Sequence, residues 1–173
     1  DHNGLISLQD LESKIQSSTA LIAVMYVNNE IGILQDIASI GEIARKKEVA
    51  FFCDATQAIG KIPVNVVADN IDMLCLSGHK FNGPKGIGAL YVRNGIKLTP
   101  LIHGGGQENG LRAGTYNTPL IVGLGEAARI ACEEFNERFK ELIKKRSEIE
   151  EYFVSNNIGT INFKDQKRAP HII

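Results

Sequence analysis

The sequence predicts an α/β fold, built from a mostly parallel sheet with flanking helices. Three continuous apolar runs, at 21–27, 49–53 and 73–76, have the length expected of strands that are buried on both faces. An amphipathic segment separates the first two runs, and a right-handed helical crossover is the usual link between parallel strands. At 173 residues the chain is long enough to bury a sizeable core.

Capping signals place the first two helices. Ser7, with Asp10 three residues later, resembles a capping box and predicts a short helix. Asp36 predicts the N-cap of a second helix, which continues through Lys47 and ends in lysines, where the helix dipole favours positive charge. The apolar face of this helix consists of Ile37, Ile40, Ile43 and Ala44.

The pattern changes after residue 76. Only a loop rich in glycine and proline separates this run from the next, at 89–92, so the later run is predicted to lie antiparallel to its predecessor. Thr118 and Pro119 then predict the N-cap and first residue of a helical pattern, one helix or two, that continues to about Asn157. Charged residues dominate this pattern after Cys132.

The change in charge divides the chain into two predicted parts. Residues 1–135 are predicted to belong to a large domain, and residues 136–173 to form a linking helix and the beginning of a smaller C-terminal domain. The chain opens inside a turn and ends where an apolar run begins, so we expect it to be an incomplete, central segment of a longer protein.

Composition argues against several classes of partner. A formal net charge of −1 gives no electrostatic reason to expect nucleic acid or an anionic membrane. No apolar run approaches the length of a membrane span, and no secretory signal opens the chain. Three widely spaced cysteines without a C-x-x-C pair fit a reducing compartment, so we expect a cytoplasmic protein. The histidines and cysteines lack metal-ligand spacing, and no metal site is predicted.

Polar side chains follow each of the three strand-like runs. Open α/β sheets bind ligands where the carboxyl ends of their strands meet, so we expect these side chains to share one site. They are Asn28, Asn29 and Glu30 after the first run, Asp54, Thr56 and Gln57 after the second, and Ser77, His79 and Lys80 after the third.

These residue types match what pyridoxal 5′-phosphate needs. A lysine amine forms a Schiff base with an aldehyde, which makes Lys80 the candidate anchor. Asp54 is predicted to keep the pyridine nitrogen protonated, so that the ring accepts electrons, and Gln57 to bind the ring oxygen. The predicted phosphate contacts are Ser77, His79 and the backbone of Gly78.

Other ligand-binding motifs are not supported. In a P-loop interpretation of this segment, Pro84 and Lys85 occupy the lysine and hydroxyl positions, and proline offers a phosphate neither charge nor an N–H. The HGGG at His103 resembles a lipase oxyanion loop, but no serine lies within G-x-S-x-G. The glycines never form G-x-G-x-x-G, which argues against a dinucleotide site.

Several motifs carry a resemblance to a known family: MYVNNEIG, FFCDATQAIGKIPV and SGHKFNGPKGIGALYV. In this order and at these spacings they resemble the class V aminotransferases, and within that family the cysteine desulfurases of iron–sulfur assembly. IHGGGQENGLRAGT resembles the family's next signature, with Asn109 where an arginine is usual. The implied fold is that of the pyridoxal-phosphate-dependent transferases of fold type I (aspartate aminotransferase-like), with residues 1–135 in the large cofactor-binding domain.

The resemblance implies a role for each matching residue. Lys80 matches the catalytic lysine that carries the cofactor and moves the α-proton. Thr115 matches a threonine that reaches the phosphate in the neighbouring subunit, which implies a homodimer. The matching cofactor contacts are Asn29, Gln57, Ser77, Gly78 and His79.

The implied activity is the removal of sulfur from L-cysteine. The products are L-alanine and a persulfide on a mobile cysteine, which passes the sulfur to an iron–sulfur scaffold or another acceptor protein. In the family, that cysteine and a carboxylate-binding arginine lie downstream of Ile173, so we expect the isolated chain to be inactive. The alternatives are a selenocysteine lyase, another class V aminotransferase, or a catalytically silent module for dimerisation or scaffold binding.

Each candidate also has a purely structural interpretation. Lys80 alone is a solvated charge, Asp54 a turn cap and His79 a packed core histidine. Asn29 is part of a turn with its neighbour, and Thr115 is an ordinary loop hydroxyl. The cysteines are predicted to be structural, because two lie in apolar runs and the third on a helix: Cys53, Cys75 and Cys132.

Overall fold

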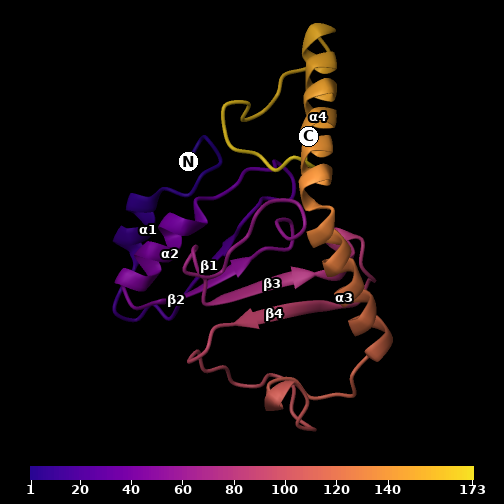
Figure 1. The fold of residues 1–173 in the computed structure, drawn as a ribbon. Coiled ribbons are helices and arrows are strands. Elements are labelled where there is room, and N and C mark those ends of the chain that lie inside the picture. The colour runs from indigo at the N-terminus through magenta and orange to yellow at the C-terminus, as the bar shows by residue number, and fades with distance from the viewer.

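The computed structural model describes residues 1–173 and shows a four-stranded sheet with helices packed around it (Figure 1). The strand order is β1-β2-β3-β4, in which β1, β2 and β3 are parallel and β4 is antiparallel to β3. The predicted α/β class and the antiparallel direction of the last strand are therefore confirmed. The bounds are Leu21–Met25 for β1, Ala50–Asp54 for β2, Met73–Ser77 for β3 and Gly88–Val92 for β4.

The helix α2 (Ile37–Lys46) makes the crossover between β1 and β2. It begins where the sequence predicts, because the side chain of Asp36 accepts a hydrogen bond from the backbone N–H of Ser39 (3.2 Å). Its apolar face is buried in the core that includes β1 and β2, at Ile37, Ile40 and Ala44. The connection from β2 to β3 consists of turns without an α-helix.

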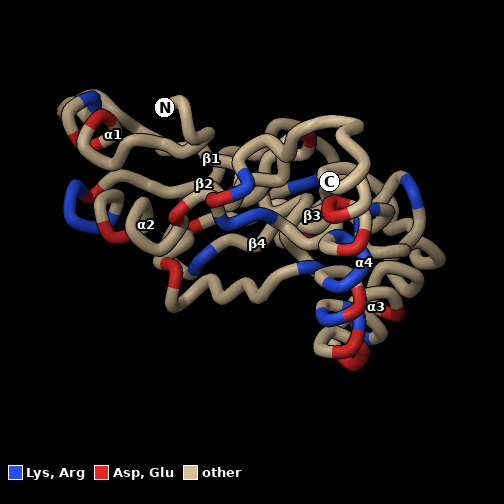
Figure 2. Tube along the Cα trace, turned by 90° about the horizontal axis from the view of Figure 1, so that it is seen from above, with Lys and Arg blue, Asp and Glu red and all other residues tan.

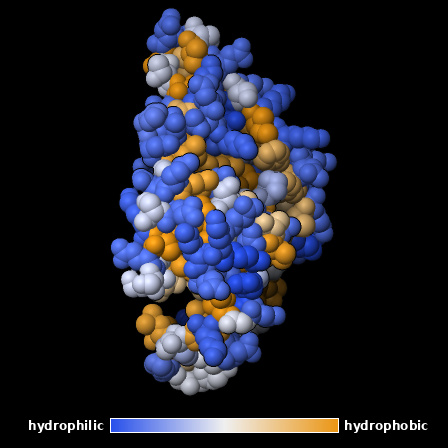
Figure 3. All heavy atoms as spheres, turned by 90° about the vertical axis from the view of Figure 1, so that its left-hand side faces the viewer, coloured by the Kyte–Doolittle hydropathy of each residue, from blue (hydrophilic) through white to orange (hydrophobic).

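The helix α1 (Leu8–Lys14) packs beside α2. The predicted cap is confirmed, because Oγ of Ser7 accepts a hydrogen bond from the N–H of Asp10 (3.1 Å). An ion pair between Lys47 and Glu12 (3.1 Å) joins the two helices at their surface. Figure 3 shows the side of the molecule on which they lie, where small hydrophobic patches alternate with hydrophilic residues.

The long helical pattern forms two helices, α3 (Thr118–Glu133) and α4 (Phe135–Ser155). The predicted N-cap at Thr118 is wrong by one residue: the side chain of Asn117 accepts the hydrogen bond from Leu120 (3.4 Å) and Pro119 lies within the first turn. Figure 2 shows acidic and basic residues along α4, where pairs one turn apart form ion pairs. No helix combines the length and apolar character needed to cross a lipid bilayer.

The main core lies around β2 and α2. Its largest fully buried side chains are Phe51, Ile37, Ile40, Ile71 and Val27. A buried acidic residue, Asp72, belongs to the same region: its Oδ2 accepts a hydrogen bond from the Phe51 N–H (2.9 Å), and it forms an ion pair with Arg93. This carboxylate is thereby fully paired at the amino end of β3.

After α4, the segment 161–173 (the C-terminal segment) returns towards the sheet (Figure 1). It is bonded to the loop that follows β1, because Leu34 donates to the carbonyl of Lys167 (3.0 Å) and Ala169 donates to the carbonyl of Gly32 (2.8 Å). Ala169 is fully buried in the main core. The predicted division between residues 135 and 136 stays a prediction.

Candidate active site

The predicted site segments meet at one edge of the sheet. Since β1, β2 and β3 are parallel, their carboxyl ends point the same way. Asp54, the last residue of β2, is in register with Met25 of β1 and Cys75 of β3. Asn29 follows β1, and Ser77 is the last residue of β3. The edge that the sequence predicts is therefore formed by the fold.

The segment after β3 forms a short 3-10 helix, η1 (Gly78–Phe81), which carries His79 and Lys80. Asn82 ends it in the left-handed conformation (φ 68°). Oγ of Ser77 lies 2.9 Å from Nδ1 of His79, so the hydroxyl and the imidazole share a hydrogen bond. Lys80 is half-buried and forms no ion pair with an acidic side chain.

Gly78 is required for packing rather than for a free N–H. A Cβ at this position would lie 3.0 Å from Cδ1 of Leu124 in α3 and 3.1 Å from Cγ2 of Ile87. Its N–H donates to the carbonyl of Ile87 (2.9 Å). The predicted help from the Gly78 backbone to a phosphate therefore cannot come from this N–H, which is already bonded inside the loop.

The turn after β2 orients Asp54. Its Oδ1 accepts a hydrogen bond from the N–H of Thr56 (2.9 Å), and Gln57 follows, half-buried, in the same turn. Burial raises the pKa of the Cys75 thiol, and the negative charge of Asp54 adds to the rise. Cys75 is the residue of β3 that is in register with Asp54.

Two of the predicted site residues, Asn29 and Thr115, are exposed. Asn28 forms the turn after β1, because its Oδ1 accepts hydrogen bonds from the N–H groups of Glu30 (2.9 Å) and Ile31 (3.0 Å), whereas the neighbouring Asn29 is exposed. Thr115 is exposed in the loop between β4 and α3, which Figure 1 shows below the sheet. The structure does not bring Thr115 to the other candidates of this chain, and both roles stay predictions.

With this geometry in place, comparison with known sequences shows the family. The pattern described as "Aminotransferase class-V" matches residues 1–173. The chain belongs to the class V aminotransferase family. It is 50% identical over 149 residues to "Cysteine desulfurase IscS" from Methanosarcina thermophila, which covers 86% of this chain and 37% of that protein. A protein of the same name from Neisseria meningitidis serogroup C is 50% identical over 178 residues, which covers 98% and 42%.

Solved structures share the fold of this class V chain. The NifS-like protein from Rickettsia africae superimposes with a TM-score of 0.93 at 34% identity, over 98% of this chain and 48% of that one. A structure described as SspA in complex with cysteine has a TM-score of 0.73 and 54% identity, over 75% and 38%. The predicted fold class is confirmed. The chain spans less than half the length of each of these relatives.

The side chains at the edge of this class V sheet fit pyridoxal phosphate by their chemistry. Lys80 offers an amine without an ion-pair partner, which suits an aldehyde. Asp54 offers an oriented carboxylate for a protonated ring nitrogen. The hydrogen-bonded pair of Ser77 and His79 offers polar groups for a phosphate. Amine, carboxylate, hydroxyl and imidazole come from two adjacent strand ends, so the donor set fits this cofactor.

The three cysteines differ in their surroundings. Cys53 is fully buried in β2, and burial, with the charge of Asp54, raises its pKa to about 12. Cys75 is half-buried and its pKa is raised as well. A raised pKa keeps a thiol neutral and unreactive, so both agree with the predicted structural role. Cys132 is exposed on α3, and its role stays a prediction.

Sequence reasoning missed two basic residues near Lys80. Burial lowers the pKa of Lys61, with the charge of Lys80 adding to the effect. Burial also lowers the pKa of His171, and the charges of Lys61 and Lys80 contribute. Lys61 lies within the motif AIGKIPV, but the sequence indicated no role for it. No local sequence signal predicts the position of His171, which belongs to the C-terminal segment.

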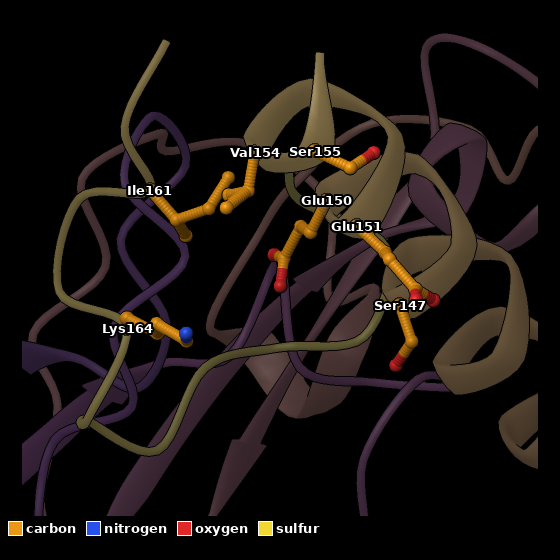
Figure 4. A pocket seen from close by; sticks show the side chains of 7 residues that line it. All are labelled: Ser147, Glu150, Glu151, Val154, Ser155, Ile161 and Lys164. Atoms are coloured by element: carbon orange, nitrogen blue, oxygen red, sulfur yellow. The ribbon is translucent and has the colours of Figure 1, made fainter. Parts of the chain in front are cut away.

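Two cavities lie away from this edge, and none of the predicted site residues lines either of them. One cavity, of about 430 Å³, lies beside Ala50 and Asp72 at the amino ends of the strands. The other, of about 320 Å³, opens between α4 and the residues after it, as Figure 4 shows. Its lining consists of Ser147, Glu150, Glu151, Val154, Ser155, Ile161 and Lys164.

Proposed function

We propose that this chain is the cofactor-bearing part of a pyridoxal-phosphate-dependent cysteine desulfurase. The observation that carries the proposal is the convergence of Lys80, Asp54 and the Ser77–His79 pair at the carboxyl edge of the sheet. The chain's identity of 50% to proteins named cysteine desulfurase supports the choice of activity within the class V family. The structure described as SspA in complex with cysteine supports L-cysteine as the substrate.

Each residue has a distinct task in this proposal. Pyridoxal phosphate, when bound, supplies an aldehyde that links to amines and a ring that accepts electrons from the α-carbon. Lys80 would hold that aldehyde and later remove and return the proton at the α-carbon of the amino acid. Asp54 would keep the proton on the ring nitrogen. The remaining contacts would be Gln57 to the ring oxygen, Ser77 and His79 to the phosphate, Asn29 near the ring, and Thr115 from the second subunit.

The wider setting of the reaction belongs to the same proposal. Sulfur would leave L-cysteine as a persulfide on a reactive cysteine and pass to an iron–sulfur scaffold or another acceptor, while L-alanine is released. The protein would act in the cytoplasm as a homodimer. Residues 1–135 would belong to the large cofactor-binding domain, and residues 136–173 to the linking helix and the start of the smaller one.

A segment exchange tests the proposed activity. The chain replaces the matching segment of the Neisseria meningitidis relative, to which it aligns over 98% of its length. With pyridoxal phosphate, L-cysteine and a thiol reductant, we expect sulfide and alanine in equal amounts over many turnovers. The same chimera with Lys80→Ala is the control and should release neither. A chimera that shows the cofactor's visible absorption band but turns over no cysteine would contradict the proposed substrate, and L-selenocysteine would be tested next.

A further inference from the structure

Three charged side chains are buried together where α4 meets the C-terminal segment. They are Arg146 and Glu150 of α4 and Arg168 of the segment, and these side chains are 18%, 17% and 6% exposed. Nη2 of Arg168 donates to Oε1 of Glu150 (2.5 Å), whose side chain lies on the side of α4 that faces the residues after the helix (Figure 4). Burying a charge is costly unless it is paired, so this ion pair fixes the segment to the helix.

Arg146 differs from the surface arginine of the same helix. Arg138 forms a close ion pair with Glu134, one turn away (2.5 Å). The corresponding distance from Nε of Arg146 to Glu150 is 3.7 Å, and this Nε has no hydrogen-bond partner. Nη1 of Arg146 donates instead to two consecutive backbone carbonyls of the C-terminal segment, at residues 168–169 (3.0 Å each). The guanidinium of Arg146 therefore holds a distant segment rather than its own helix.

The two residues that this guanidinium holds are paired with the loop after β1. The N–H of Ala169 donates to the carbonyl of Gly32 (2.8 Å), and the backbone of Arg168 forms an isolated antiparallel β-bridge with Ile33, which is fully buried. Gly32 is in the left-handed conformation (φ 69°), and a Cβ there would lie 3.0 Å from the Cβ of Ile172. The C-terminal segment is thus both bonded to this loop and packed closely on it.

The same loop carries Asn29, a proposed cofactor contact. Asn29 lies in a turn that two backbone hydrogen bonds close. Asn28 donates to the carbonyl of Ile33 (3.1 Å), and Gly32 donates to the carbonyl of Asn28 (3.0 Å). Ile33 and Gly32 are the residues that the C-terminal segment pairs with. Because Asn29 is exposed, the backbone of the turn rather than side-chain packing determines its position.

We propose that Arg146 is a positioning residue, which holds the turn of Asn29 at the carboxyl edge of the sheet. Its guanidinium fixes the backbone of residues 168–169, which in turn fixes Gly32 and Ile33 at the base of the turn. Arg146 is not among the proposed cofactor contacts and acts only through this backbone. The effect on the cofactor rests on the proposed function, whereas the effect on the turn does not.

Amide hydrogen exchange of the chain without cofactor, followed residue by residue by NMR, tests the effect on the turn. Arg146→Met removes the donors and keeps an unbranched side chain. We expect the amides of Ala169 and Asn28 to exchange about tenfold faster or more, and that of Cys53 in β2 to be unchanged. Arg146→Lys still offers donors and should restore most of the protection. Arg138→Met breaks a surface pair of the same helix and is the matched control, in which none of these amides should change.

Two results of this exchange experiment would overturn the proposal. Equal acceleration at Cys53 would show a general loss of stability rather than a local effect on the turn. Unchanged exchange at Asn28 in Arg146→Met would show that the guanidinium does not hold the turn.

A double-mutant cycle in the segment-exchange enzyme tests the effect on the cofactor. The dissociation constant of pyridoxal phosphate, measured from its visible absorption band, is compared for Asn29→Ala, Arg146→Met and the double variant. Each single variant should weaken binding about tenfold. The double variant should bind no more weakly than Asn29→Ala, because Arg146 acts only through the turn.

Independent effects, which would multiply to about a hundredfold in the double variant, would overturn the link from Arg146 to Asn29. Unchanged binding in Asn29→Ala would overturn the cofactor part of the proposal. If Lys80→Ala keeps the absorption band in the same enzyme, the proposed function fails instead, and the exchange experiment alone decides the role of Arg146.

Discussion

Lys80 owes its position to backbone geometry rather than to a charged partner. It lies on η1, between the Ser77–His79 hydrogen bond and the left-handed turn at Asn82. An amine that forms no ion pair is free to condense with an aldehyde, and Asp54 on the adjacent strand supplies the carboxylate that the ring nitrogen needs. At the scale of single residues, the two chemical partners of the proposed cofactor are therefore supplied by neighbouring strand ends.

Removal of the Lys80 amine should abolish covalent attachment of the cofactor. We expect borohydride reduction in the presence of pyridoxal phosphate to label the peptide that contains Lys80, and Lys80→Ala to lose both the label and the visible absorption band. Lys85→Ala, at an exposed lysine, should keep both. A label on Lys61 or Lys85 in the unmodified chain would contradict the assignment.

Asp54→Asn should keep the cofactor but lose most activity in the segment-exchange enzyme. A neutral amide does not hold the ring proton, so the ring accepts electrons poorly. We expect turnover to fall by several powers of ten, on the order of 4 kcal/mol or more of transition-state stabilisation. Asp165→Asn, at an exposed aspartate of the C-terminal segment, is the control and should change little. Near-normal turnover of Asp54→Asn would refute the proposed role.

At the scale of elements, β2 and β3 carry apolar side chains into the core and a polar residue at the carboxyl end. β2 shows this most clearly, since Phe51 and Cys53 are fully buried and Asp54 follows at the edge. The helices α1, α2 and α3 begin at side-chain caps, which are Ser7, Asp36 and Asn117, whereas α4 begins without one. The reactivity of the cysteine thiols and the stability that the cap of α3 contributes can both be measured directly.

The three cysteine thiols should react in the order of their exposure. In the folded chain, Ellman's reagent should modify one thiol rapidly, Cys132 on the exposed face of α3, whereas Cys75 reacts slowly and Cys53 only on unfolding. Cys132→Ala should remove the rapid phase, and denaturant should expose all three thiols. A rapid phase that survives in Cys132→Ala would show that a strand thiol is accessible.

The cap of α3 should contribute measurable stability. Asn117→Ala removes the acceptor for the Leu120 N–H and should lower the free energy of unfolding by about 1 kcal/mol in urea titrations. Asn117→Asp keeps an acceptor and should cost much less. Thr118→Ala should have a small effect, because Thr118 lies inside the helix. A larger loss of unfolding free energy for Thr118→Ala than for Asn117→Ala would show that Thr118 is the N-cap, as the sequence predicted.

At the scale of the whole molecule, the C-terminal segment is tied to both the helices and the sheet. The side chain of Arg168 forms an ion pair with Glu150 of α4. Its backbone forms an isolated antiparallel β-bridge with Ile33, in the loop after β1. Ala169 is buried in the main core. These contacts hold His171 in a position that the local sequence does not predict. Because its ring is buried there, the pKa of His171 is lower in the folded chain than in the unfolded chain.

His171 should make folding stability depend on pH below neutrality. Its folded pKa is about 4, below the ordinary value of 6.5, so the unfolded chain binds the proton first as the pH falls. The stability that the neutral ring contributes is present above pH 6.5 and is lost as the pH falls towards 4. We expect the melting temperature to fall less over this range in His171→Gln than in the unmodified chain. Parallel curves for the two would contradict the buried, neutral ring.

The sequence by itself determined the α/β class, the strand directions, the caps at Ser7 and Asp36, and the sheet edge that carries Asp54 and Lys80. These features follow from apolar periodicity and from contacts between residues close in the chain. Only the tertiary structure decided that the Gly78 N–H bonds to the Ile87 carbonyl and that both ring nitrogens of His171 are buried without a hydrogen bond. The physical reason is that burial and long-range packing determine which polar groups find partners, and local sequence does not encode the distant segment that covers them.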